Sequence, residues 1–219
     1  MMDFTQWVTD IGMTEQMLLM LLYIPVIVTL INFTRYVVGF KTLGIYAPMV
    51  LAYAYIFTGI RFGLLITAAV IAGTLITYSI FKKVRMHYIS RISVNYILVT
   101  FFIIFVIAFN EISPFPITTE NHNVATIPPL GVILIVTLSD FFIKQYVKKD
   151  LGSSLRAVAE TVVIGIAGWA LLRLPFLQVF ILDNLWLQPI LLGVNIALGK
   201  YTGVRFKELF RFQRVIKDE

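Results

Sequence analysis

The sequence alternates between long apolar runs and short polar clusters. The predominantly apolar runs lie near residues 17–34, 42–58, 62–81, 92–110, 125–143, 154–173 and 185–199. A helix of about 20 apolar residues is long enough to cross a bilayer. We expect helices rather than strands, because backbone groups in lipid must be satisfied within the segment and the alternation of a membrane barrel is missing. The pattern therefore predicts an all-α, polytopic helical membrane protein with seven transmembrane helices.

The composition excludes an ordinary soluble domain. Hydrophobic residues make up 59% of the 219 positions and charged residues only 14%, whereas soluble domains carry about 25% charged residues. Seven spans would use about 140 residues, so only short loops remain. The predicted organisation is an outer interfacial segment at 1–16, a transmembrane domain at 17–199 and a basic amphipathic tail at 200–219.

The basic residues lie in alternate polar segments, which predicts the orientation of the spans. Arg61 and Arg173 lie in loops on one side, and the other Lys and Arg residues of the total of 18 fall on the opposite side. Basic loops stay in the cytoplasm, so we expect the N-terminus outside and the C-terminus in the cytoplasm of a prokaryotic cell membrane. This location explains the net charge of +6 without a nucleic-acid partner.

Both ends of the chain show the pattern of helices that lie on a membrane surface. Apolar residues share one helical face at each end: Phe4, Trp7, Val8 and Ile11 at the start, and Phe206, Leu209 and Phe210 in the tail. The tail is interpreted as an anchor on an anionic leaflet or as a docking face for a cytoplasmic partner.

Two runs contain residues that disfavour helices. The second run contains Gly44 and Pro48, and the fifth opens with Pro128 and Pro129. Proline frees backbone carbonyl groups, which at membrane depth require protein or a wet cavity. Interrupted helices of opposite direction are typical of an inverted repeat around a transport site. The prolines could equally mark kinks or the first turns of helices, and the sequence leaves both interpretations open.

Asp140 and Glu160 lie near the predicted cytoplasmic edges of the fifth and sixth runs. Each has a basic residue four positions away on the same helical face, Lys144 for Asp140 and Arg156 for Glu160. One interpretation is a pair of local interfacial ion pairs. The other is a polar vestibule shared by the cytoplasmic ends of the two runs.

Other polar residues in or near the apolar runs are interpreted as structural. Arg173 and Asp183 bracket Pro175 on the outer side, and we expect them to pair and pin that loop. Asn95 and Asn195 are expected to form hydrogen bonds between helices.

The sequence contains no recognisable catalytic arrangement. His87 and His122 fall in loops on opposite sides of the membrane, so they do not form a metal site together. Phosphate-binding loops and dinucleotide fingerprints are missing, and the absence of cysteine excludes thiolate sites. An aspartyl dyad of Asp140 and Asp183 is not expected, because they lie near opposite faces. We therefore interpret the chain as non-enzymatic and expect no cofactor.

Two stretches resemble a known family. The stretch GFKTLGIYAP at residues 39–48, followed by Leu51 and Ala52, resembles the start of the seven-transmembrane region usually fused to an inactive transglutaminase-like domain. The ending LGKYTGVR at residues 198–205, with the pairs at 208–209 and 211–212, resembles its closing motif. Residues 42–91 are also similar to the small membrane subunit of poly-γ-glutamate synthases.

The resemblance implies a role beside other proteins. Family members are typically encoded with ATP-grasp ligases similar to those that add glutamate to peptides, which implies a membrane partner of an amide-ligase or peptide-polymer system. A transglutaminase-like domain is not recognised in the sequence, so a separate chain would have to provide it. By motif position, the resemblance implies two functional corners, formed by Lys41, Thr42, Gly44 and Pro48 and by Arg205, Glu208 and Arg211.

Three hypotheses follow. The preferred one is a non-catalytic membrane subunit that docks a cytoplasmic ligase and holds or passes an acidic peptide, which the positive rim would attract. The alternative is a transporter or channel for a small anion, with its site at the helix breaks. The third is a structural anchor whose cations serve only topology and lipid headgroups.

Overall fold

The computed structural model describes residues 12–112 and 128–200, and these parts of the chain form helices without strands. This confirms the all-α prediction. The helices are α2 (Glu15–Phe33), the π-helical segment η1 (Thr34–Val38), α3 (Tyr46–Thr58), α4 (Ile60–Phe81), α5 (Tyr88–Ile112), α6 (Pro129–Val136), α7 (Leu138–Lys148), α8 (Leu151–Arg173), α9 (Pro175–Asp183) and α10 (Leu187–Gly199). The predicted tail helix, and most of the predicted interfacial segment at 1–16, lie outside the described residues.

The described residues contain five helices that are long and apolar enough to cross a membrane. They are Glu15–Val38, Ile60–Phe81, Tyr88–Asn110, Pro129–Val147 and Leu151–Arg173. The pair α9 and α10 passes the same criteria together but bends by 102° at its break, and α3 has only 13 residues. The described part of the chain therefore supports a multi-pass membrane protein with five spans, or six if the bent pair counts as one. Seven spans and their orientation stay predictions.

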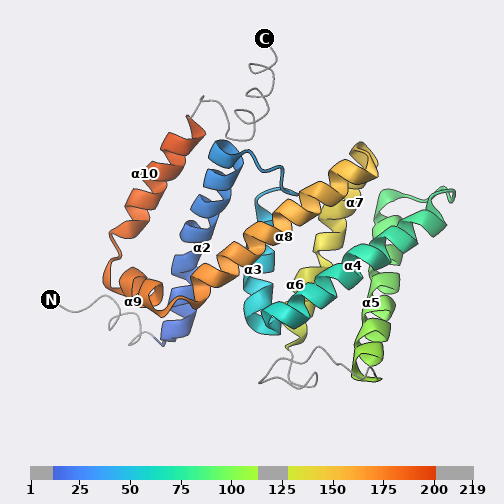
Figure 1. Ribbon diagram of the computed structural model, residues 1–219, viewed down its shortest axis with the longest axis horizontal. Coiled ribbons are helices and arrows are strands. Elements are labelled where there is room, and N and C mark those ends of the chain that lie inside the picture. Colours follow the sequence, from blue (N-terminus) through green and yellow to red (C-terminus); the bar gives the residue numbers. More distant parts are fainter. Residues whose placement is uncertain (1–11, 113–127, 201–219) are drawn as a thin grey trace, which may run out of the picture.

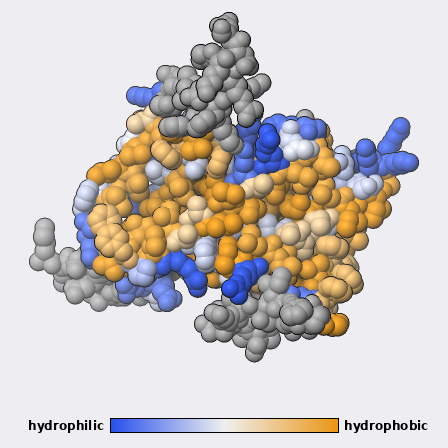
Figure 2. Space-filling model, in the orientation of Figure 1, coloured by the Kyte–Doolittle hydropathy of each residue, from blue (hydrophilic) through white to orange (hydrophobic). Residues whose placement is uncertain are grey.

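The helices run back and forth, so the basic loops gather at one end of the bundle. In Figure 1 the ends of α2, α4, α7 and α10 and the starts of α3, α5 and α8 point toward the upper edge. This upper edge, with Arg35, Lys41, Lys83, Lys149 and Lys200, is called the basic end below. Figure 2 shows a broad apolar surface across the middle of the same view, as expected for a surface that faces lipid.

Helices α3 and α8 are parallel neighbours at the centre of the bundle, and small residues allow their close approach. The buried face of α8 repeats small residues every three or four positions: Ser154, Ala157, Thr161, Gly165 and Gly168. A Cβ atom at Gly168 would lie 2.8 Å from the Cβ of Ala52, and one at Gly165 would lie 2.9 Å from that of Leu51. Small residues at such spacing let membrane helices pack backbone against backbone.

The two prolines of the fifth run mark a helix start. Pro128 is the N-cap of α6 and Pro129 is its first residue, where the missing amide is not needed. Pro48 is likewise in the first turn of α3. One helix interruption that the sequence did not predict lies at Thr137, between α6 and α7, where the Thr137 hydroxyl donates to the carbonyl of Leu134 at 2.7 Å.

Of the predictions for the other polar residues, the one for Asn195 is confirmed, and those for Asn95 and for the pair of Arg173 and Asp183 are wrong. The Asn195 amide nitrogen donates to the Thr29 hydroxyl, and its oxygen accepts from the Asn32 amide, both at 2.6 Å, so the predicted hydrogen bonds between α2 and α10 are confirmed. The prediction for Asn95 was wrong. Its side chain is 1% exposed, and its amide has no hydrogen-bond partner among the described residues. It lines a cavity of about 10 Å³, which is about the size of one water molecule.

The predicted ion pair between Arg173 and Asp183 was also wrong. The guanidinium group of Arg173 lies 5.2 Å from the centre of the Trp169 ring, and no ion pair joins it to Asp183 in the described part of the chain. The stretch between them is the helix α9 rather than a loop. The Gln178 side chain stabilises the start of α9 by donating a hydrogen bond to the carbonyl of Leu172 at 2.8 Å.

Candidate functional site

A non-helical stretch at residues 39–45, called the extended segment below, leads into α3 at the basic end. Gly39 has a φ of 91° and Gly44 a φ of 113°, which side chains with a Cβ rarely adopt. Between them the Thr42 hydroxyl donates to the carbonyl of Gly44 at 2.9 Å. The two glycines therefore fix a chain path that is not helical, and its amides need partners outside the segment.

Two side chains of α8 satisfy these amides. The Glu160 carboxylate accepts from the backbone amide of Lys41, and the Thr161 hydroxyl accepts from the amide of Leu43 at 2.9 Å. Thr161 is fully buried and donates its own proton to the carbonyl of Ala157 at 2.6 Å. Glu160 lies about 14 Å along the axis from the start of α8. The extended segment thus runs into the end of the bundle rather than over it.

Two adjoining polar cavities lie between this segment and the facing ends of α7 and α8. Their volumes are about 390 and 550 Å³, and they share Lys41, Gln145 and Lys149 as lining residues. We call them together the cationic recess. The other lining residues are Arg35, Phe40, Thr42, Leu43 and Gly44 in the smaller cavity, and Asp150, Gly152, Ser153, Arg156 and Ala157 in the larger one.

The charge of the cationic recess is strongly positive. Arg35, Lys41, Lys149 and Arg156 line it, and none of the four forms an ion pair within the described part of the chain. Among the described residues of the lining, Asp150 is the one acidic residue, and its carboxylate caps α8 by accepting from the amide and hydroxyl of Ser153. A concave surface with one sign of charge concentrates ions of the other sign. The geometry therefore suits a ligand with several carboxylates or another polyanion.

We expect the stability of the recess to fall on acidification when Asp150 becomes protonated. The hydroxyl and the amide of Ser153 bond to the charged form, which lowers the pKa of Asp150 below its ordinary value of 3.8. Such a group contributes stability that is fully present above the ordinary pKa and is lost as the pH falls through the lowered value. In Asp150→Asn, which keeps a capping oxygen without a charge, the thermal midpoint in detergent should depend less on pH below about pH 5. Parallel pH profiles would contradict this role of Asp150.

The structure brings together some of the predicted site residues. Lys41, Thr42 and Gly44 line the cationic recess, Glu160 holds the backbone of Lys41, and Pro48 is buried just below, in the first turn of α3. The vestibule considered between the fifth and sixth runs corresponds in position to the larger cavity, but its lining is mainly cationic and does not include Asp140.

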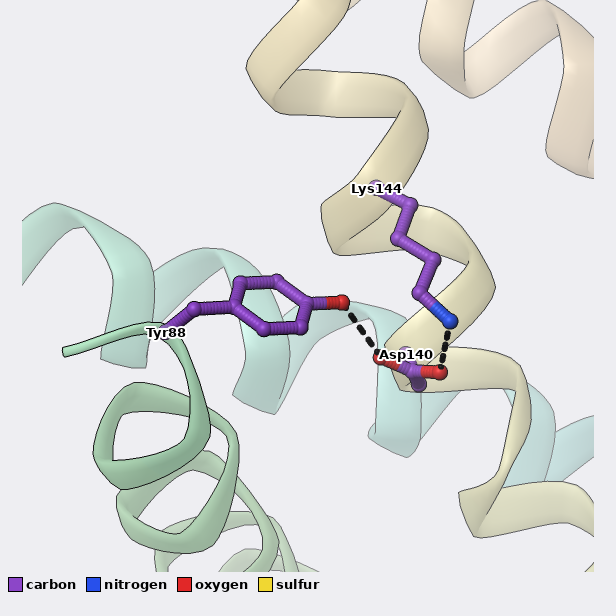
Figure 3. Close-up of polar contacts among 3 residues, drawn as sticks. All are labelled: Tyr88, Asp140 and Lys144. Carbon is purple, nitrogen blue, oxygen red and sulfur yellow. Dashed lines mark hydrogen bonds and ion pairs between the residues drawn. The ribbon is translucent and has the colours of Figure 1, made fainter.

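Other predicted site residues lie elsewhere. Asp140 accepts from Lys144 at 2.7 Å and from the Tyr88 hydroxyl at 3.3 Å (Figure 3), so its predicted local ion pair is confirmed. Pro128 and Pro129 lie at the opposite end of the bundle. Arg205, Glu208 and Arg211 lie outside the described residues.

The structure does not support the interpretation of Glu160 and Arg156 as a local ion pair. Both residues are on α8, yet the Glu160 carboxylate accepts from the amide of Lys41, and no ion pair joins it to Arg156 in the described part of the chain. Sequence reasoning also missed Arg35, Gln145 and Lys149 as site residues. Their only sequence signal is their place in polar segments of the basic side, which is shared by many residues with no part in the recess.

Comparison with known proteins gives one match. Residues 1–216 match the family described as "7 transmembrane helices usually fused to an inactive transglutaminase". No curated protein and no solved structure matches the chain. The match supports the resemblance seen in the motifs at residues 39–48 and 198–205, but the similarity to the poly-γ-glutamate synthase subunit stays a prediction.

Proposed function

Because the chain belongs to the family of seven transmembrane helices usually fused to an inactive transglutaminase, we propose that it is a non-catalytic membrane subunit that holds an acidic peptide at its basic end. The observation that carries this proposal is the cationic recess. Four cations from α8, the α7–α8 turn, η1 and the extended segment converge there on an open polar cavity, and none of them forms an ion pair with another described residue. An acidic peptide offers several carboxylates at spacings that such a recess can engage together.

The proposed partner is a cytoplasmic amide ligase of the ATP-grasp type, bound at the basic end of a subunit in the cell membrane. Basic loops stay in the cytoplasm, so the recess would face the ligase that makes or extends the acidic peptide. A transglutaminase-like chain would be a second partner on the opposite side. Co-purification in mild detergent should recover the ligase, and repeated recovery of the chain alone would count against this part of the proposal.

Transport of a small anion is the second candidate, and the extended segment at the mouth of the cationic recess favours it. Non-helical backbone beside a polar cavity is typical of transporter sites. However, α3 and α8 pack closely against each other, with Gly165 of α8 against Leu51 of α3 and Gly168 against Ala52. Holding a ligand is therefore favoured over conducting it. Uptake of anions by reconstituted liposomes, abolished in Lys41→Ala, would reverse this order.

We expect the purified protein to bind a fluorescent oligo-glutamate peptide through the cationic recess. In Lys41→Gln/Lys149→Gln, the affinity should fall by roughly tenfold or more, since each lost charged contact is worth about 1 kcal/mol at an exposed site. The matched control is Lys82→Gln/Lys83→Gln, which removes the same charge from the basic end outside the recess. Fluorescence anisotropy measures both. Equal losses in the two variants would show that only the overall charge attracts the peptide, and would refute the recess as the site.

A further inference from the structure

Another cavity lies between α5 and α6, and its lining is apolar where that of the cationic recess is polar. Its volume is about 590 Å³, and its lining is apolar over most of its length, with Phe62, Ile103, Ile107, Val132 and Ile133 among the lining residues. Helix α5 packs along α4 and meets α6 and α7 at only a few positions, so a groove remains between α5 and α6. The size is within the range of roughly 300–1,000 Å³ that is common for ligand sites.

The groove opens sideways, toward the hydrocarbon of the bilayer. Ile104 and Ile133 line it and expose 57% and 63% of their surface. Both α5 and the α6–α7 pair belong to segments that can cross a membrane. An apolar groove at this depth is accessible to lipid chains.

The groove ends in a polar cluster toward the basic end. Tyr96 and Thr137 line the groove, and the backbone amide of Asp140 donates to the carbonyl of Thr137 at 3.2 Å. Asp140 accepts hydrogen bonds from Lys144 at 2.7 Å and from Tyr88 at 3.3 Å, and Figure 3 shows the two donors approaching the carboxylate from different sides. Asp140 is 21% and Lys144 52% exposed, so a headgroup can reach both.

We propose that the groove binds one phospholipid whose headgroup carries both a phosphate and a primary ammonium group. One acyl chain lies between α5 and α6, the ammonium group is bound by Asp140, and the phosphate is bound by Lys144. The charges of the protein argue for this headgroup. The Asp140–Lys144 pair is neutral as a whole, so the pair itself gives an anionic headgroup no net attraction, whereas a zwitterion offers a partner for each member of the pair. A quaternary amine, in contrast, has no proton to donate to Asp140.

The acyl chain is tested by filling the groove. In Thr100→Trp, where the new ring enters the groove lining, native mass spectrometry of protein purified from membranes should show phosphatidylethanolamine occupancy reduced by roughly fivefold or more. The matched control is Ile97→Trp, which is on the same helix and is also exposed, but lies outside the groove lining. A thermal melt of each variant checks folding. Unchanged occupancy in folded Thr100→Trp, or equal loss in both variants, overturns the proposal.

The headgroup is tested by competition in delipidated protein. Phosphatidylethanolamine should raise the thermal midpoint more than phosphatidylglycerol or phosphatidylcholine with the same chains. The preference should disappear in Asp140→Asn, where the carboxylate is lost but a similar shape remains, and should persist in Asp183→Asn, which changes an aspartate outside the cluster. Equal shifts with all three lipids in the unmodified protein, or a preference that survives in Asp140→Asn, overturn the headgroup assignment. Neither experiment involves the cationic recess, so the outcome is independent of the proposed function.

Discussion

Gly168→Leu is expected to lower the thermal midpoint of the protein by about 6–12 °C, which corresponds to about 3 kcal/mol for a chain of this size. At this position even a Cβ atom would lie 2.8 Å from the Cβ of Ala52, closer than real contacts allow. A leucine adds three more heavy atoms to the same space. Relieving this clash requires α8 to move away from α3, which disrupts the packing between the two helices at the centre of the bundle.

Gly193→Leu is the control for this experiment. Gly193 is inside α10, and a Cβ atom there would meet nothing within 4 Å. The substitution adds the same side chain to a helix without a clash, and replacing glycine raises helix propensity by up to about 1 kcal/mol. The control should therefore melt at or above the temperature of the unmodified protein, measured by fluorescence-detected size exclusion after heating. If Gly168→Leu melts at the same temperature, the close α3–α8 contact does not limit the stability of the bundle.

The positions of the helices follow from the sequence because lipid allows few alternatives. A run of apolar residues in a bilayer must satisfy its backbone internally, so most of each run became a helix. The exceptions depend on tertiary contacts. Residues 42–45 are apolar enough to be counted in a span, yet they lie outside a helix, since Thr161 offers an acceptor that an isolated helix would not need. The bend between α9 and α10 was missed for a similar reason, because the apolar composition of a segment does not show in which direction its helix axis runs.

The cationic recess could be predicted only in part. The motif at residues 39–48 identified Lys41, Thr42 and Gly44, but nothing in the sequence shows that Lys149 reaches the same cavity from more than a hundred positions away. The spacing rule for helices was correct for Asp140 and Lys144, which have no stronger competitor. It did not predict the partner of Glu160, because the backbone amide of Lys41, in another segment, binds the carboxylate. Local spacing thus predicts a pair only where no distant backbone group needs the same atom.

Thr161→Val is expected to lower the free energy of unfolding by about 1–3 kcal/mol and to loosen the cationic recess. Valine has nearly the shape of threonine, so packing against α3 is kept. The Thr161 hydroxyl, however, is the acceptor for the Leu43 amide at 2.9 Å, and Leu43 is buried. Without the Thr161 hydroxyl, the Leu43 amide loses its acceptor inside the bundle. An unpaired buried donor lowers the free energy of unfolding by more than the hydrogen bond itself contributes.

The consequence for function separates this variant from simple destabilisation. If residues 39–45 detach from α8 in Thr161→Val, Lys41 leaves the cationic recess. The affinity for oligo-glutamate should then fall, and the backbone amides of this segment should exchange hydrogen faster. Thr161→Ser is the control, because serine keeps the hydroxyl and should preserve both binding and protection despite its smaller volume. Loss of binding in Thr161→Ser but not in Thr161→Val would mean that the methyl group, rather than the hydrogen bond, holds the segment. The structure argues for the hydrogen bond, because an extended segment whose amides point at α8 has no helical partner to replace it.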